Sequence, residues 1–167
     1  MSERPQRRSL NHQLWILAKC YIDSANILSN QVSKTGNGDP LPAMIMCTSF
    51  SIELVLKCLL VVTRDEIRTI GDLEGTGIDL RGHDFIALFD KVEARYQAVV
   101  LEQMTLSISA IKTMEDLRTW LRELGSDPFT FWRYVYEQDR IPKPRYGDIK
   151  RFGGALWRAI NVIRRFN

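Results

Sequence analysis

The sequence predicts an all-α fold, an up-and-down bundle of about five to six helices formed by one domain of 167 residues. Apolar residues recur at three- and four-residue steps, which is the period of a helix with one buried face. Runs with the alternating pattern of strands are missing, and Gly and Pro cluster between the helical segments. Residues 49–60 are apolar nearly all round, which indicates a helix at the centre of the bundle.

The first helix is expected over about residues 11–32, after a short basic tail of about residues 1–10. Its apolar stripe comprises Leu14, Leu17, Ala18, Tyr21, Ala25 and Leu28. A turn-rich stretch follows, and Pro42 suits the first turn of the second helix because its missing N–H would be unpaired there anyway. This second helix is expected over about residues 43–62.

A glycine-punctuated linker over residues 64–82 comes next, anchored by Ile67, Ile70, Leu73 and Ile78. His83 and Asp84 then open a third helix, whose apolar face is Phe85, Leu88, Phe89, Val92, Tyr96 and Val99. The sequence leaves open whether this helix continues to Ile111 or breaks near Thr105.

Three further segments complete the predicted bundle. Residues 113–116 resemble a capping box and start a short helix, and Asp127 followed by Pro128 starts another. The last helix is expected over about residues 148–165. Its apolar face is Ile149, Phe152, Leu156, Ile160 and Ile163.

Positive charge gathers at both ends of the chain, although the net charge is only +3. The N-terminal cluster is Arg4, Arg7 and Arg8. The C-terminal cluster is Lys143, Arg145, Lys150, Arg151, Arg158, Arg164 and Arg165. These two ends would form a phosphate-binding face if folding brought them together.

The cysteines and the apolar runs indicate a cytoplasmic protein. Cys20, Cys47 and Cys58 suit small core residues, and Cys47 and Cys58 are too far apart on one helix to form a disulfide. No signal segment opens the chain, and no run reaches the roughly 18 apolar residues of a membrane span, so no membrane partner is expected. Metal-ligand spacings and phosphate-cradling glycine loops are absent from the sequence, so no cofactor is expected.

Glu53 and Lys57 are the charged residues of the central apolar segment, and their spacing places them on one helix face. Buried charges are paired, or they belong to a functional site. In one interpretation they line a groove. In the favoured interpretation they connect the second helix to its neighbours, with Glu53 accepting a hydrogen bond from Arg133 or His83. His83 beside Asp84 is expected to cap and pack rather than to act as an acid or base.

Three segments together resemble the HEPN domain family: residues 51–57, residues 82–89 and residues 131–137. This resemblance implies a small, often dimeric all-α module of the kind found in toxin–antitoxin, phage-defence and RNA-processing systems. Active members of that family are metal-independent endoribonucleases. Their signature motif is an arginine followed, after four to six residues, by a histidine. There the arginine would hold the scissile phosphate and the histidine would move protons.

This chain departs from the HEPN motif at its expected place. Four to six residues after Arg133 the sequence reaches Gln138, Asp139 and Arg140, none of which is a histidine. Arg7 and His12 have the spacing but lie in or before the first helix, so their match is interpreted as chance. The resemblance therefore implies a module without robust catalysis of its own.

Two sets of residues are the remaining candidates for a site. Arg133, Tyr136 and Glu137 would form a variant pocket that binds phosphate, stacks a base and orients the arginine, or else a surface ion pair beside an aromatic core. The other set is Arg151, Arg158 and Arg165, which recur every seven residues on one side of the last helix. They either form a solvated face or bind a phosphate backbone. Trp15, Trp132 and Trp157 are expected to be core or dimer-interface anchors rather than base-stacking platforms.

The leading expectation is thus a HEPN-like module that binds RNA, a nucleotide or a protein partner. The alternative is a metal-independent endoribonuclease built around Arg133, Tyr136 and Glu137, and a third possibility is a structural helical adaptor. A homodimer is expected, and the resemblance implies a cognate antitoxin or defence-complex protein as partner.

Overall fold

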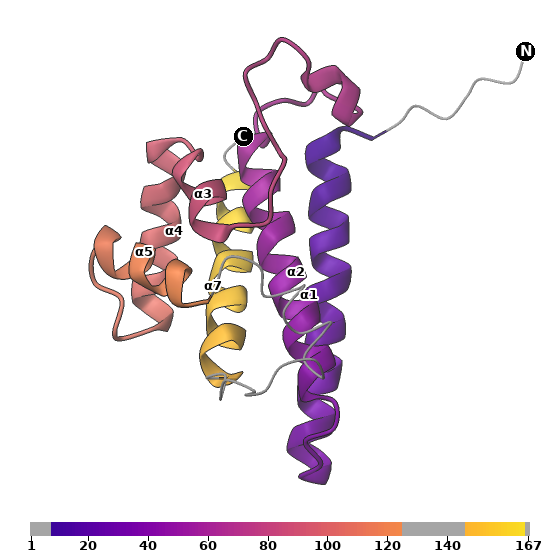
Figure 1. Ribbon diagram of the computed structural model, residues 1–167, viewed down its shortest axis with the longest axis vertical. Helices are drawn as coiled ribbons and strands as arrows, with labels where there is room; N and C mark the ends of the chain where they lie inside the picture. The colour runs from indigo at the N-terminus through magenta and orange to yellow at the C-terminus, as the bar shows by residue number, and fades with distance from the viewer. Residues whose placement is uncertain (1–7, 125–145, 166–167) are drawn as a thin grey trace, which may run out of the picture.

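The computed structural model describes residues 8–124 and 146–165, and these residues are helical apart from their connections (Figure 1). The elements are α1 (Leu10–Thr35), α2 (Leu41–Leu60), a 3-10 helix η1 (Ile70–Leu73), α3 (Phe85–Asp90), α4 (Ala94–Ser107), α5 (Met114–Glu123) and α7 (Tyr146–Arg165). The predicted all-α helical bundle is confirmed. The short helix predicted after Asp127 lies outside the described residues.

Helices α1 and α2 form a long antiparallel hairpin (Figure 1). Helix α1 ends where Gly36 adopts a left-handed φ of 68° and donates its N–H to the carbonyl of Val32. Pro42 occupies the first turn of α2, as predicted. Ser9 and Leu10 are buried, and the Leu10 N–H donates to the carbonyl of Ile67 at 2.6 Å, so the fold begins inside the range predicted as a tail.

Helix α2 is the core helix, and α1, α3 and α7 pack around it. Its apolar residues are buried on nearly every side, which confirms its predicted central place. The full helix is also long and apolar enough to qualify as a membrane span, contrary to the expectation from the sequence, because its mean hydropathy reaches 1.8 despite five hydroxyl and charged residues. About two thirds of that window is covered by the rest of the fold, as in any core helix.

The third predicted helix is in fact two helices, α3 and α4. Helix α3 ends at Asp90 rather than continuing to Val99. The side chain of Gln97, in the first turn of α4, donates to the carbonyls of Phe89 and Val92, both at 3.0 Å. This amide connects the first turn of α4 to the end of α3, where the Phe89 carbonyl also accepts from the Val92 N–H at 3.0 Å. Helix α4 then ends at Ser107, close to the break considered near Thr105.

Helix α7 closes the bundle against α2, and its predicted apolar face is buried throughout. The two helices pack closely at Gly153, where an added Cβ would lie 2.8 Å from the Thr48 methyl group. The capping box of Thr113 and Asp116 at the start of α5 is confirmed by both of its hydrogen bonds.

Three residues predicted to be buried are exposed: Leu17, Ile70 and Cys20. Leu17 is 48% exposed and Ile70 is 72% exposed, so neither is the anchor that the sequence pattern indicated. Cys20 is exposed rather than buried. Cys58 does lie in the core, where its thiol donates to the carbonyl of Asn11 and burial raises its pKa to about 12.

Candidate functional site

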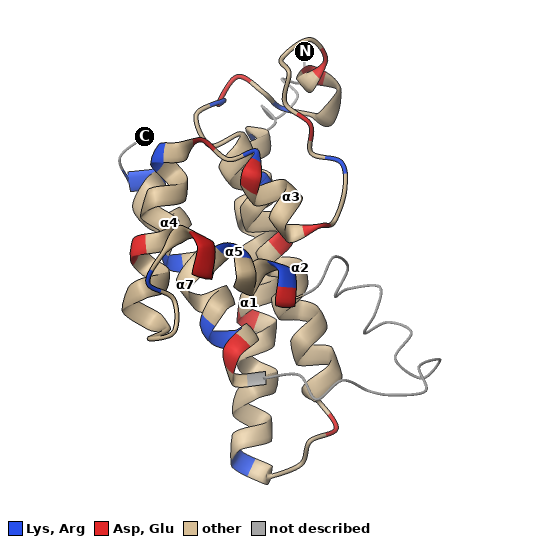
Figure 2. Ribbon diagram, turned by 60° about the vertical axis from the view of Figure 1, so that its left-hand side comes forward, with Lys and Arg blue, Asp and Glu red and all other residues tan. Residues whose placement is uncertain are grey.

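The outer face of α7 carries three parallel rows of residues spaced by seven positions. Seven residues make almost two helical turns, so each row runs along one side of the helix. One row is the predicted set Arg151, Arg158 and Arg165. A second row is Lys150, Trp157 and Arg164, and between them run Gly147, Gly154 and Asn161. Figure 2 shows the basic residues of α7 spaced along the length of the helix.

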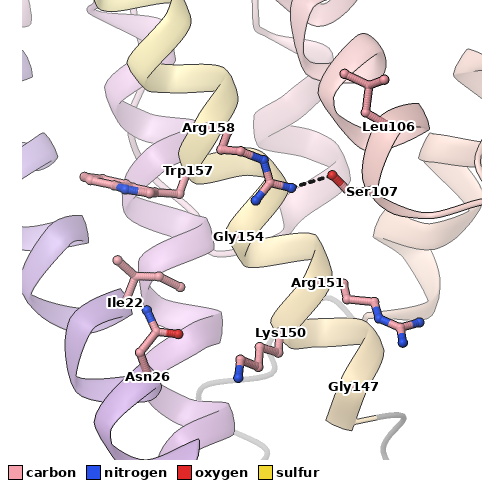
Figure 3. Close-up of a pocket in the computed structure, with 10 residues that line it drawn as sticks. All are labelled: Ile22, Asn26, Leu106, Ser107, Gly147, Lys150, Arg151, Gly154, Trp157 and Arg158. Atoms are coloured by element: carbon pink, nitrogen blue, oxygen red, sulfur yellow. Dashed lines mark hydrogen bonds between the residues drawn. The ribbon is translucent and has the colours of Figure 1, made fainter. Parts of the chain in front are cut away.

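Over the first half of α7 these rows border a depression of about 690 Å³, which we call the α7 groove. The groove lies between α1, which contributes Ile22 and Asn26, and the end of α4 at Leu106 and Ser107 (Figure 3). Gly147 and Gly154 form its floor, and the first has no atom within 4 Å of the place where a Cβ would stand. The glycine row therefore keeps the space between the two rows of long side chains open.

Two of the three cations of the α7 groove are held by hydroxyl groups rather than by carboxylates. Lys150 Nζ donates to Ser29 Oγ at 2.7 Å, and Arg158 donates to Ser107 Oγ (Figure 3). Arg151 is 67% exposed, and its nearest acid is Asp148 at 4.0 Å. A hydroxyl partner leaves the charge of a cation uncompensated, so this part of the described surface is positive.

A second depression, of about 440 Å³, continues the α7 groove past Leu106, Ser107 and Arg151. It runs over the loop between α4 and α5 and contains Lys112, Trp120 and Asp148. The extended surface thus adds one cation, an acid and an aromatic ring beyond the groove.

Side chains span the seam between α1 and α7. The rings of Trp15 and Trp157 stack with their centres 5.5 Å apart, and Trp15 Nε1 donates to Asn161 Oδ1 at 3.0 Å. Both indoles are partly buried and pack against the core. They therefore act as packing anchors, as predicted, whereas Trp132 lies outside the described residues.

Beyond this stack, the C-terminal end of α7 meets the N-terminal end of α1. Arg8 and Arg164 line one pocket together with His12 and Asp65. Folding thus brings Arg8 of the N-terminal cluster and Arg164 of the C-terminal cluster together. Arg165 is exposed at the same end of α7, outside the groove lining.

Glu53 and Lys57 of α2 form a separate cluster with His83, which lies just before α3. Glu53 is only 3% exposed. Its Oε1 accepts from Lys57 Nζ at 2.7 Å, and its Oε2 lies 3.1 Å from His83 Nδ1. Asp84 caps α3 by accepting from the Ala87 N–H, so this cluster connects α2 to the start of α3. These contacts agree with the structural interpretation of Glu53.

Arg133, Tyr136 and Glu137 lie outside the described residues, so the variant pocket stays a prediction. Gly147 and Gly154 were not predicted as a groove floor, and Lys150 was predicted only as one member of the C-terminal basic cluster. Their seven-residue spacing between two basic rows was present in the sequence. What it did not reveal was which helices would form the two walls.

Scans against family models, curated proteins and solved structures found no match to this chain. Within residues 8–124 and 146–165, no group of three or more His, Cys, Asp or Glu side chains is placed to hold a metal ion.

Proposed function

We propose that this protein is a HEPN-like helical module that binds RNA along the α7 groove without cleaving it. The observation that carries the proposal is the set of Lys150, Arg151 and Arg158 around an open, glycine-floored depression. Two of these three cations have hydroxyl partners, and the third has an acid only at 4.0 Å.

Phosphodiester chains match this arrangement in charge and in length. From Lys150 to Arg158 the helix rises about 12 Å, which presents successive cations to successive phosphates. Phosphate oxygens can replace the Ser29 and Ser107 hydroxyls as acceptors, because charge-assisted hydrogen bonds are stronger than those to neutral groups. An RNA strand would therefore gain contacts without breaking an ion pair of Lys150 or Arg158.

Binding is favoured over cleavage by the chemistry of the described groove residues. None of them is a histidine, and His83 is engaged with Glu53 in the cluster on α2. Proton transfer near neutral pH most often uses histidine. The groove residues supply positive charge and space, which is what retention of a phosphate chain requires.

The test is fluorescence anisotropy with a labelled single-stranded RNA in EDTA, comparing two double variants of equal charge. Arg151→Gln with Arg158→Gln removes two groove cations. Arg95→Gln with Arg122→Gln removes two exposed arginines that pair with Glu93 and Glu115 elsewhere. We expect the groove variant to bind at least tenfold more weakly and its salt slope to fall by about 1.4, since each lost contact contributes about 0.7 for single strands.

The control variant should retain the affinity of the wild type. Equal losses in both double variants, or no binding by the wild type, would contradict the proposal. The RNA recovered from each sample is expected to be intact. Cleavage that Arg133→Ala abolishes would instead establish the variant endoribonuclease.

A further inference from the structure

A second cationic pocket lies at the opposite end of α7 from the groove. It has a volume of about 450 Å³ and is lined by Arg8, Ser9, Asn11, His12, Asp65 and Arg164. The stacked Trp15 and Trp157 separate it from the groove, with Trp157 in the groove lining and Arg164 over the Trp15 ring at 5.1 Å. We call it the Arg8–Arg164 pocket.

Neutral groups hold the Arg164 guanidinium in place. Its Nη1 donates to Asn11 Oδ1 at 3.0 Å. Asn11 is 3% exposed and itself donates to the Val62 carbonyl at 3.2 Å and to Asp65 Oδ1 at 2.8 Å. The buried amide thus fixes the arginine on one side and occupies the aspartate on the other.

The positive charge of this pocket exceeds its negative charge. Among the described residues, neither Arg8 nor Arg164 forms an ion pair with a carboxylate. Asp65 is the acid in the lining, and Asn11 already engages it. Two guanidinium groups therefore face one pocket with a single carboxylate beside them, which favours a bound anion.

His12 adds a charge that depends on protonation. Its Nδ1 lies 3.5 Å from Arg164 Nη2, a contact that is a hydrogen bond only when Nδ1 is unprotonated. Burial lowers the pKa of His12, and Arg8 and then Arg164 lower it further, while Asp65 opposes them. These charges come from the chain before α1, from α7 and from the segment after α2.

We propose that the Arg8–Arg164 pocket binds a phosphomonoester group on Arg8, Arg164 and His12, and that His12 takes up a proton as the group binds. Two arginines and an imidazolium match a charge of about −2, which a phosphomonoester carries near neutral pH and a phosphodiester does not. A bound dianion reverses the field at His12 that the two arginines create. The group would belong to a free nucleotide or to the terminal phosphate of an RNA strand.

The test is an NMR pH titration of the two histidines with and without inorganic phosphate, in which His83→Gln assigns the signals. We expect phosphate to raise the pKa of His12 by about one pH unit or more, as an opposite charge within ~4–6 Å does. The ring signals of His83, whose Nδ1 contacts Glu53 instead, should be the same at each pH with and without phosphate. An unchanged pKa of His12 in phosphate would overturn the proposal.

Arg8→Gln provides a second readout at an exposed position. Without ligand this variant should have a higher His12 pKa than the wild type, because one positive charge has gone. With phosphate the further rise should be smaller than in the wild type. A rise of the same size in both proteins would show that the anion binds elsewhere.

Two further ligands distinguish the source of the phosphate. A nucleoside monophosphate and a 5′-phosphorylated RNA should both raise the pKa of His12 if the pocket accepts either ligand. If only one of them raises it, that ligand is the source of the phosphate group. A 5′-hydroxyl RNA should leave it unchanged. A matching rise with the 5′-hydroxyl RNA would contradict a monoester site. Repeating the series in Arg151→Gln with Arg158→Gln shows whether the pocket works without the groove.

Discussion

Glu53 is the residue whose chemistry could be inferred best from the sequence alone. An acid in an apolar helix needs partners, and Lys57 at the following turn was an evident one. His83 was proposed as a second partner from across the fold, and the structure places it at 3.1 Å. The other proposed partner, Arg133, lies outside the described residues.

Replacing Glu53 tests this structural role. Glu53→Gln removes the charge that compensates Lys57 in a largely buried setting and weakens the contact with His83. We expect the free energy of unfolding, measured by urea denaturation, to fall by about 1–3 kcal/mol. The control is Glu115→Gln at an exposed ion pair with Arg122, which should change it by less than about 1 kcal/mol. Unchanged stability with weaker RNA binding would return Glu53 to the functional interpretation.

At the residue scale, burial was predicted wrongly where only packing defines which face of a helix is covered. Leu17 and Cys20 fit a helical apolar stripe as well as Leu14 and Ala18 do. In the structure α1 buries a narrow face, mainly against α2, where Ser51 Oγ also donates to the Ala18 carbonyl at 3.0 Å. The width of the covered stripe depends on how many neighbours a helix has, which spacing does not reveal.

At the scale of elements, two adjacent glycines of α7 have opposite surroundings. Gly153 faces α2, where a Cβ would lie 2.8 Å from Thr48 Cγ2. Gly154 faces the groove, where a Cβ would meet only the flexible Arg158 side chain at 3.7 Å. The first glycine permits the helices to pack closely, whereas the second leaves the groove floor open.

Alanine at the two glycines should therefore change stability in opposite directions. Gly153→Ala forces α7 away from α2 and should lower the free energy of unfolding by about 1–3 kcal/mol. Gly154→Ala gains helix propensity without a clash and should raise it by about 0.5–1 kcal/mol. Thermal or urea denaturation of the two variants measures both. Changes of the same sign would mean that α7 does not present these faces to α2 and to the groove.

The break between α3 and α4 shows where element prediction from sequence reaches its limit. Phe89, Val92 and Tyr96 keep a helical spacing across the break and are all buried. The apolar periodicity therefore predicts one continuous helix. The break is stabilised by the Gln97 amide, a polar contact that periodicity does not include. By contrast, the start of α5 was predictable because its cap is formed by local residues.

At the scale of the whole molecule, the antiparallel register of α1 and α7 positions both cationic sites. Ser29 meets Lys150, Trp15 meets Asn161, and Asn11 meets Arg164. This register places Arg8 and Arg164 in one pocket at the C-terminal end of α7, and the α7 groove over the first half of the same helix. The sequence showed the charges but not the direction of the last helix relative to the first, which depends on how often the chain reverses between them.

The central claim, that an RNA phosphate chain lies over the floor of the α7 groove, is tested most directly at Gly154. Gly154→Gln and Gly154→Glu place side chains of nearly equal size on that floor and differ in charge alone. Anisotropy with single-stranded RNA should give an affinity for Gly154→Glu at least tenfold below that of Gly154→Gln, because the added carboxylate repels phosphate and pairs with the groove cations. Equal affinities for the two variants would contradict the claim.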